Sequence, residues 1–338
     1  MNYEIASPVA SEVDFSAEGK QLGYLRLPHS VHRSAYGWIP IPVASIRNGA
    51  GPKVLLMAGN HGDEYEGQIL LSRLIREVEP AMVRGQMVIL PMANFPAADA
   101  GLRTSPIDQG NLNRTFPGDP LGSPTEVIAH YIETVLLAGA DLLVDLHSGG
   151  SSLLYHQANM LAVDGKTADD KAKLRALFTA LGLPHALFLE VGEGPGYFSS
   201  SAAKRQGAMA ITTELGGGGM VQPALLAMGE QGLRHLLGHA GVLTGPLVPD
   251  SPPGVPRLMR VEPEHYVYAT ERGLFEPLVE LGETASAGQP AARIHFPDAP
   301  GKAPVTVHFD RDGLVVCKRV PARCERGDCL FHLGGEAD

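Results

Sequence analysis

Several features that would assign this chain of 338 residues to a special class are scarce or missing in its sequence. It has three cysteines, Cys317, Cys324 and Cys329, and an odd number close together suits a reducing compartment better than a disulfide framework. No apolar run is long enough to span a bilayer, and residues 1–15 lack the basic and apolar parts of a secretory signal. We therefore expect a cytoplasmic protein.

Basic charge is also scarce. Lysine and arginine number 27 against 37 aspartates and glutamates, the formal net charge is -10, and no segment concentrates lysine or arginine. This balance argues against nucleic acid or an anionic membrane as a partner. A hydrophobic content of 44% with 19% charged residues is typical of a compact globular protein. We expect a small-molecule substrate, and a homo-oligomer as the commoner state.

The segment GNHGDEYEG, residues 59–67, is the most informative motif in the chain. The apolar run 54–57 precedes it, and apolar residues at helical spacing follow it from residue 71 to residue 78. His61 and Glu64 are therefore expected on a turn at the end of a buried strand, where α/β proteins place their chemistry. An imidazole nitrogen and a carboxylate oxygen three residues apart fit two corners of a zinc tetrahedron, although an ordinary polar turn has the same pattern.

Two further apolar strands end in residues that suit such a site. The strand 142–146 leads into DLHSGG, so His147 becomes the candidate third ligand, followed by small residues that permit a close approach. Asp145 either orients that imidazole or is an ordinary polar residue at a strand end. The strand 209–213 ends at Glu214 before four glycines, where a carboxylate is well placed as a general base, the alternative being a solvent-exposed strand end.

Two segments without periodicity supply candidate substrate-binding residues. Residues 94–122 form a predicted loop whose length suggests function. It carries Arg103 and the run NLNRTFPGD, in which Asn111, Asn113 and Arg114 are suited to a bound carboxylate. The glycine-rich segment GEGPGYFSS has the composition of a mobile lid, and its Tyr197 is a further candidate to contact the ligand.

Strands and helices alternate along most of the chain, which predicts an α/β fold with a mostly parallel or mixed sheet flanked by helices. A capping box at 123–126 predicts a helix to about residue 138, and further helices are expected at 169–181 and 224–239. The strand 38–46 contains two prolines, so we expect it at a sheet edge.

The proline-rich segment 246–256 is typical of a linker and divides the chain into two predicted domains. Residues 1–248 form the expected catalytic domain, and residues 257–338 a C-terminal β domain. The second domain contains two similar halves that begin at Gly273 and Gly313, which predicts a barrel-sandwich-like module.

The candidate residues combine into one coherent site. Two histidines and one glutamate, His61, Glu64 and His147, leave a zinc ion with an open fourth position, as in catalytic zinc sites. A single Zn²⁺ per chain would lower the pKa of a bound water, while Glu214 takes its proton and transfers it to a leaving nitrogen. The predicted reaction is amide hydrolysis.

The motifs resemble those of the succinylglutamate desuccinylase and aspartoacylase family, relatives of the zinc carboxypeptidases. The matching pieces are GNHGDEYEG, Arg103 followed by NLNR, DLHSGG and TTELGG, together with the β-rich C-terminal tail. The resemblance implies a zinc-carboxypeptidase-like fold and the same three zinc ligands, with Glu214 as the base. It also implies that Arg103 supports the polarised carbonyl oxygen and that Asn113 and Arg114 hold the carboxylate of the amino acid.

Within the family, the neighbourhoods of NLNRTFPGD and HSGG are most similar to the N-alpha-acetyl-L-2,4-diaminobutyrate deacetylases of ectoine degradation. A cationic substrate is also favoured by acidic residues on the metal and lid segments, namely Asp63, Glu66, Glu190 and Glu193. Lys204 and Arg205 precede Glu214, but the sequence does not fix their register against the basic residue that aspartoacylases use for a side-chain carboxylate, which puts an acidic substrate in doubt.

The alternatives are succinylglutamate desuccinylase or aspartoacylase activity, a metal-binding relative without catalysis, and a carrier role for the C-terminal module. A carrier would hold its group covalently on Lys302, the one lysine near the turn between the two halves.

Overall fold

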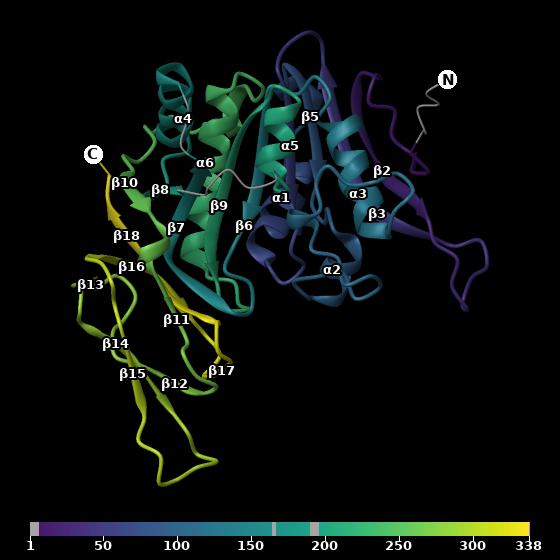
Figure 1. Cartoon of the computed structure of the whole chain (residues 1–338). Helices are drawn as coiled ribbons and strands as arrows, with labels where there is room; N and C mark the ends of the chain where they lie inside the picture. Colours follow the sequence, from purple (N-terminus) through teal and green to yellow (C-terminus); the bar gives the residue numbers. More distant parts are fainter. Residues whose placement is uncertain (1–6, 164–166, 190–195, 338) are drawn as a thin grey trace.

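The structure, a computed structural model, describes residues 7–163, 167–189 and 196–337. A 14-stranded mixed sheet forms its centre, in the order β1-β2-β3-β5-β4-β6-β9-β7-β8-β10-β18-β16-β13, with β11 paired to β18 (Figure 1). The mixed α/β class is thus confirmed. The strands before residue 220 are β1 (Ala10–Ser11), β2 (Gly19–Pro28), β3 (Trp38–Asn48), β4 (Lys53–Ala58), β5 (Gly85–Leu90), β6 (Leu142–His147), β7 (Leu153–Val163), β8 (His185–Leu189) and β9 (Met209–Gly217).

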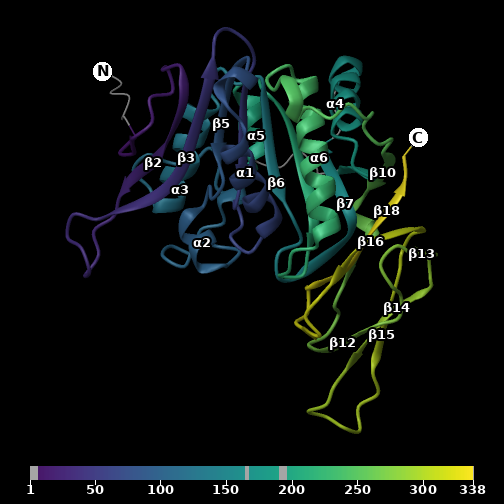
Figure 2. The same ribbon diagram turned by 180° about the vertical axis from the view of Figure 1, so that it is seen from behind.

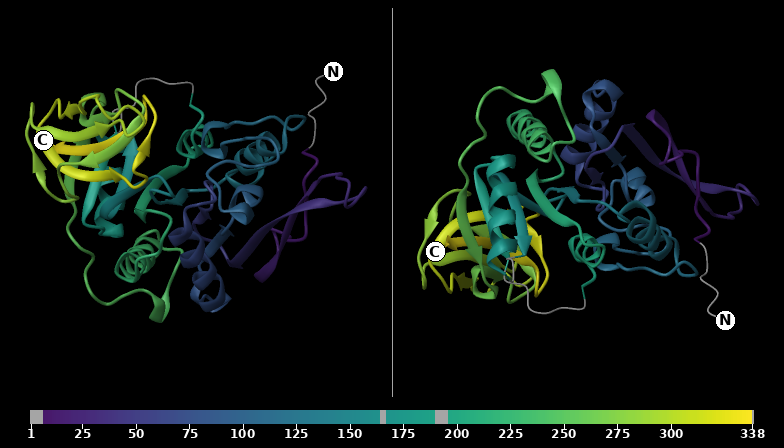
Figure 3. Two further views of the ribbon diagram at one scale, coloured as in Figure 1. Left: turned by 90° about the horizontal axis from the view of Figure 1, so that it is seen from below. Right: turned by 90° about the horizontal axis from the view of Figure 1, so that it is seen from above.

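The helices cover both faces of this sheet (Figure 3). None of those in the described ranges is long and apolar enough to cross a membrane. They are α1 (Tyr65–Glu77), α2 (Phe95–Ala100), α3 (Pro124–Tyr131), α4 (Ala168–Leu181), α5 (Ser199–Arg205) and α6 (Pro223–His239), with the π-helical turn η3 (Ile132–Leu136) and the 3-10 turns η1 (Pro80–Met82), η2 (Leu112–Arg114), η4 (Gly245–Leu247) and η5 (Pro263–His265).

The central strands are buried on both sides, and alternate residues enter different cores. In β4, Val54 and Leu56 pack in the core that contains α1, α4 and α6, whereas Leu55 and Met57 pack in the core that contains α3 and α5. This follows from the two-residue period of a strand. Strands β5, β4, β6 and β9 are parallel to one another, so their carboxyl ends lie along the same edge of the sheet.

The helix predictions hold in outline. The capping box at Ser123 and Glu126 is present, and the helix that it begins continues from α3 into the π-helical turn η3, which ends at Leu136. The predicted loop 94–122 needs a correction, because it contains the short helix α2 and the 3-10 turn η2. Each of these two elements is too short to show a helical spacing of apolar residues in the sequence.

Strand β3 lies between β2 and β5 instead of at the sheet edge that its prolines suggested. Strand β5 pairs only with residues 44–48 of β3, whereas β2 pairs with the whole strand. Pro40 and Pro42 thus lie where one side of β3 has no neighbouring strand, so their missing N–H groups remove no ladder hydrogen bond. Proline is thus confined to a part of the strand that is unpaired on one side, as expected, although β3 as a whole lies inside the sheet.

The strands after residue 250 do not form a separate appendage. Strand β10 pairs in parallel with β8, and β16 pairs with β7, so that β7, β8, β10, β18 and β16 close into a ring. Their bounds, with those of the remaining C-terminal strands, are β10 (Arg257–Val261), β11 (Tyr266–Tyr268), β12 (Gly273–Pro277), β13 (Thr284–Ala285), β14 (Pro290–His295), β15 (Val305–His308), β16 (Gly313–Arg319), β17 (Arg323–Cys324) and β18 (Cys329–Glu336).

The two similar halves of the C-terminal segment give three strands each. The first half forms β12, β13 and β14, and the second forms β16, β17 and β18. The short middle strands are exchanged, because β13 pairs with β16 and β17 pairs with β12. The sheet β15-β14-β12-β17 projects beyond the central sheet (Figure 2). The division into domains 1–248 and 257–338 stays a prediction, since hydrogen bonds join the two parts.

Candidate metal centre and active site

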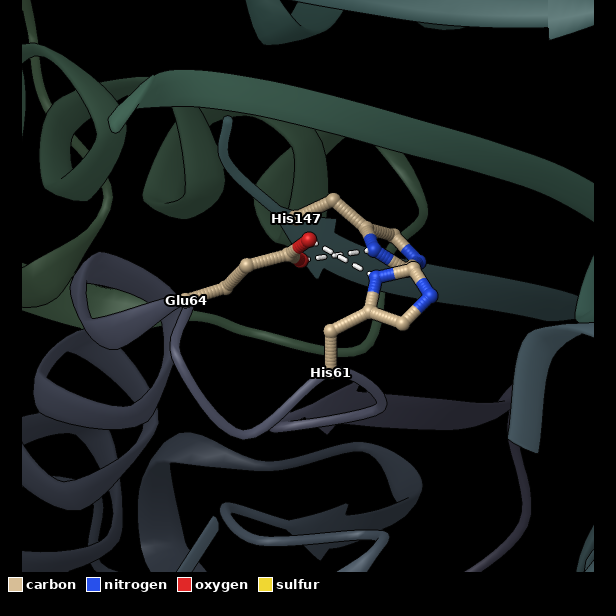
Figure 4. Close-up of side chains that lie close together, drawn as sticks. All are labelled: His61, Glu64 and His147. Atoms are coloured by element: carbon tan, nitrogen blue, oxygen red, sulfur yellow. Dashed lines mark hydrogen bonds and ion pairs between the residues drawn. The ribbon is translucent and has the colours of Figure 1, made fainter. Parts of the chain in front are cut away.

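The three predicted metal ligands lie together at the carboxyl edge of the parallel strands. His61 and Glu64 come from the turn between β4 and α1, and His147 is the last residue of β6. Their ligand atoms all lie within 4.8 Å of one another, and all three side chains are buried. His61 Nδ1 is 2.7 Å from Glu64 Oε1, and His147 Nδ1 is 2.8 Å from Glu64 Oε2 (Figure 4).

Local backbone geometry explains why glycines surround these residues. Strands β4 and β6 are adjacent and parallel, so the turn after Ala58 meets the end of β6. A Cβ at Gly62 would lie 2.0 Å from Ala97 O, and one at Gly149 would lie 2.1 Å from Leu153 O. Larger residues would therefore displace the loops that carry His61 and His147. The close approach predicted for the glycines after His147 is made by the protein's own backbone.

The outward nitrogens of both histidines have acceptors. His61 Nε2 donates to Asn111 Oδ1 at 3.2 Å, and His147 Nε2 donates to Asp145 Oδ2 at 2.9 Å. In the neutral rings this tautomer leaves both Nδ1 atoms as acceptors, and these face the Glu64 carboxylate. Three acceptors converge on one point and need a cation or protons between them. Two imidazoles and a carboxylate are the donors that zinc prefers, so the residues present fit a metal ion.

The electrostatics of the cluster agree with a site for positive charge. Burial alone raises the pKa of Glu64, but the two histidines outweigh it and hold that pKa below its usual value. Burial alone lowers the pKa of His147, but Asp145 and Glu64 outweigh it and raise that pKa well above its usual value. The cluster therefore retains protons strongly when it holds no metal, and we expect metal binding to release them.

Glu214 lies beside this cluster. It pairs with His147 across β6 and β9, and its Oε2 is fully buried and has no hydrogen-bond partner among the described residues. Burial, with a further contribution from Glu64, raises the pKa of Glu214 to about 8. A positively charged ion at the three neighbouring ligands would lower this value toward neutrality. A buried carboxyl with an unused oxygen and a pKa near neutral has the properties of a general base.

Two arginines from the loop between β5 and α3 border the site. Arg103 Nη1 is 3.6 Å from Glu64 Oε1, and its side chain is about half exposed. Burial, together with Arg103, lowers the pKa of Arg114. Within the part of the chain that the structure describes, Arg114 has no ion pair. Its guanidinium lies 4.7 Å from the ring centroid of Phe198 and donates to Asn113 O.

The other predicted substrate residues take different positions. Asn111 contacts a metal ligand, His61, as described above. Asn113 Oδ1 accepts a hydrogen bond from the backbone of Ser199, which leaves its amide nitrogen as the donor that could still bind a ligand. Tyr197 is about half exposed and lines a cavity of about 430 Å³ together with Arg114, and none of the three metal ligands borders that cavity. The substrate roles of these residues stay predictions.

The acidic residues that suggested a cationic substrate are partly engaged elsewhere. Asp63 accepts a hydrogen bond from Ser151 N at 2.7 Å, and Glu66 is buried, with its pKa raised mainly by that burial. Glu190 and Glu193, with residues 192–195 of the predicted lid, lie outside the described residues. The described acidic residues of these two segments therefore give no support for a cationic substrate.

Two residues of the site were given no role from the sequence, although both lie in motifs quoted above. Asn60 is buried and donates to Asp145 Oδ2 at 3.0 Å, and Ser199 Oγ donates to the same oxygen at 2.6 Å. Asp145 thus orients His147 instead of being an ordinary strand-end residue. Its position two residues before the histidine left both interpretations open, and neither motif indicated that Asn60 and Ser199 donate to it.

Comparison with known proteins gives consistent matches. Residues 50–240 match the family model described as succinylglutamate desuccinylase/aspartoacylase catalytic domain. The chain is 42% identical over 327 residues to the N-alpha-acetyl-L-2,4-diaminobutyric acid deacetylase of Halomonas elongata, covering 96% of this chain and 94% of the relative.

Solved structures are similar over almost the whole chain. The product-bound ectoine utilization protein EutE (DoeB) of Ruegeria pomeroyi has a TM-score of 0.93 and 37% identity, covering 98% of this chain and 100% of that protein. A structure described as succinylglutamate desuccinylase/aspartoacylase from Rhodobacter sphaeroides has a TM-score of 0.91 and 36% identity, with the same coverage.

Proposed function

Because this chain belongs to the succinylglutamate desuccinylase/aspartoacylase family, we propose that it hydrolyses the amide bond of N-alpha-acetyl-L-2,4-diaminobutyrate with one Zn²⁺ per chain. The products are diaminobutyrate and acetate, which places the reaction in ectoine degradation. The observation that carries the proposal is the convergence of His61, Glu64 and His147 beside Glu214, whose Oε2 is buried and has no hydrogen-bond partner among the described residues. The identity of 42% over almost the full length of a deacetylase supports the choice of substrate.

Each residue of the centre has a defined task. Asn111 accepts a hydrogen bond from Nε2 of His61, and Asp145 accepts one from Nε2 of His147. These bonds fix the tautomers that can bind a metal through Nδ1. Zinc, when bound there, supplies a Lewis acid for the carbonyl oxygen and lowers the pKa of a water molecule to about 7. Glu214 would take a proton from the water whose oxygen bonds to the carbonyl carbon, and would deliver that proton to the amide nitrogen as the carbon–nitrogen bond breaks.

The two arginines are assigned to negative charges, Arg103 to the carbonyl oxygen and Arg114 to the substrate carboxylate. Arg103, which already approaches Glu64, lies where a donor would stabilise the oxygen on which charge develops. Arg114 has no counterion among the described residues, and its guanidinium lies over the ring of Phe198 and donates to Asn113 O. A guanidinium held in this way without an acidic partner suits bidentate binding of an α-carboxylate.

The surroundings also favour a substrate with a single carboxylate. Arg205 donates to both carboxylate oxygens of Glu133 at 2.7 and 2.8 Å and to Gly196 O, and Lys204 is exposed. Arg205 is therefore committed to Glu133, and no hydrogen bond or ion pair among the described residues joins Lys204 to the metal centre. This supports an acetyl-diaminobutyrate over a succinyl or aspartyl substrate.

The substrate assignment is tested by comparing kcat/KM for acetyl-diaminobutyrate, acetyl-aspartate and succinyl-glutamate under one set of conditions. We expect acetyl-diaminobutyrate to be preferred at least about tenfold, a difference of about 1.4 kcal/mol in transition-state binding. A tenfold preference for either dianionic substrate would instead favour desuccinylase or aspartoacylase activity and leave the hydrolytic mechanism intact.

Replacing Arg114 by alanine should raise KM mainly for substrates with a free α-carboxylate, because a bidentate ion pair is lost. The measurement is kcat/KM on the free acid and on its amide-capped analogue. Arg114→Lys is the matched control, because it keeps the charge but loses the planar fork and should recover only part of the loss. Equal losses on the two substrates would contradict the carboxylate-binding role.

The remaining predictions have separate checks. A carrier role would require a modified Lys302, whose ammonium lies 3.5 Å from the ring centroid of Phe296, and an intact-mass measurement would detect the added group. The homo-oligomeric state and the cytoplasmic location stay predictions, testable by light scattering and by cell fractionation.

A further inference from the structure

Ser199 contacts both halves of the site with different atoms. It is the first residue of α5 and is 1% exposed. Its hydroxyl donates to Asp145 Oδ2 at 2.6 Å, and its backbone amide donates to Asn113 Oδ1 at 2.9 Å. One buried residue thus joins the carboxylate that orients a metal ligand to the segment that binds the substrate carboxylate in the proposed function.

The first contact fixes the orientation of Asp145. Its Oδ2 accepts from Asn60, His147 and Ser199, while its Oδ1 has no hydrogen-bond partner among the described residues. A carboxylate held through one oxygen depends on every donor to that oxygen for its rotation. Loss of the shortest of these hydrogen bonds would loosen the partner that holds the ring of His147.

The second contact is one of three between the same two segments. Phe116 N donates to Tyr197 O at 3.3 Å, and Arg114 lies on the ring of Phe198. The third is the hydrogen bond from Ser199 N to Asn113. Phe198, the residue before α5, makes no side-chain capping hydrogen bond, so Asn113 satisfies one of the free amide groups at the start of that helix.

The far end of α5 is also fixed. Arg205 pairs with the buried Glu133 and donates to Gly196 O, so both ends of this helix are tied to neighbouring segments. The helix therefore holds Ser199 in place, with its amide on the substrate loop and its hydroxyl on Asp145. The position of each partner depends on its hydrogen bond to this one residue.

We propose that Ser199 is a positioning residue that couples the substrate loop to the metal centre, through Asn113 on one side and through Asp145 and His147 on the other. Closure of the loop on a substrate carboxylate then tightens the orientation of a metal ligand. The inference rests on the proposed function in taking Asn113 and Arg114 as the substrate site.

The first test measures zinc affinity by chelator competition in the absence of substrate. Ser199→Ala should weaken zinc binding about tenfold or more, the usual scale for loss of a group that supports a metal ligand. Ser201→Ala is the matched control on the same helix, where Ser201 lies against Gly196, and it should bind zinc like the wild type. Affinities within about twofold of wild type in Ser199→Ala, or equal losses in the two variants, would overturn the proposal.

A second variant guards against misfolding. If Ser199→Ala gives no folded protein, Ser199→Cys keeps the size of the side chain and replaces the hydroxyl by a weaker donor. It should also weaken zinc binding, and an unchanged affinity in the folded variant would overturn the proposal.

The coupling itself is tested by a double-mutant cycle on zinc affinity. Asn113→Ala should weaken zinc binding, although Asn113 touches no metal ligand. The double variant with Ser199→Ala should bind zinc within about twofold of Ser199→Ala alone, because both substitutions break the same connection. Losses that multiply, or no effect of Asn113→Ala, would show that the two residues act separately.

Kinetics separate this inference from the substrate assignment. In Ser199→Ala saturated with zinc, kcat should fall more than KM rises, because the orientation of the centre is impaired while Arg114 remains. A KM effect alone would contradict a role at the metal centre. If the wild type binds zinc but does not hydrolyse acetyl-diaminobutyrate, the proposed substrate fails, whereas the zinc affinities still decide the role of Ser199.

Discussion

His147→Ala is expected to lose bound zinc and hydrolytic activity together. The variant keeps His61 and Glu64, which lie on one turn, and two protein ligands do not hold zinc as three do. It also removes one of the three hydrogen-bond partners of Asp145 Oδ2. The measurement is zinc content of the purified protein beside its turnover on acetyl-diaminobutyrate.

His239→Ala provides the control for this variant, because His239 is an exposed histidine at the end of α6. It should keep one equivalent of zinc and normal turnover. A full equivalent of zinc in His147→Ala would show that the metal is held elsewhere.

Glu214→Gln is expected to keep zinc and to lose about a hundredfold or more in turnover, the usual scale for a positioned general base. Glutamine has almost the same shape as glutamate, so the packing of β9 beside His147 is preserved while proton transfer is abolished. Single-turnover kinetics with measured zinc occupancy distinguish this loss from loss of metal.

Glu66→Gln is the matched control for the base. Glu66 is a second buried carboxyl near the centre, and burial raises its pKa as it does that of Glu214. It should retain nearly normal turnover. If the two variants exchanged these results, Glu66 would be the base.

The convergence of the three candidate metal ligands was predictable, because each lies beside a recognisable strand. The apolar runs before His61 and His147 fix two parallel strands, and adjacent parallel strands bring their carboxyl ends together. Glu214 follows from the same logic on β9. The apolar runs and the order of the strands therefore predict where the site lies.

The supporting residues were not predictable, because their contacts join positions far apart in the sequence. Asn60 reaches Asp145 across 85 residues, and Ser199 reaches it across 54. Neither position has a local pattern that distinguishes it from an ordinary polar residue. Such contacts depend on how α5 and the loop after β4 pack, and the sequence of neither segment alone predicts that packing.

The strand order at the C-terminal end was not predictable either. The duplicated halves indicated a β module, but the pairing of β16 with β7 depends on a register between residues 153–155 and 317–319. The prolines of β3 correctly predicted a stretch with no neighbouring strand on one side, but they wrongly predicted a strand at the edge of the sheet. The sequence does not show how far β5 extends along β3.

The closed ring of strands has a consequence for how the chain is made. During synthesis, β7 and β8 leave the ribosome well before β10, β16 and β18, which complete their hydrogen bonding. Until then the nascent protein exposes unpaired strand edges, which are templates for aggregation. Strand β18, which follows β10 and β16 in the sequence, joins these two strands, so the sheet is complete only after β18 has been released.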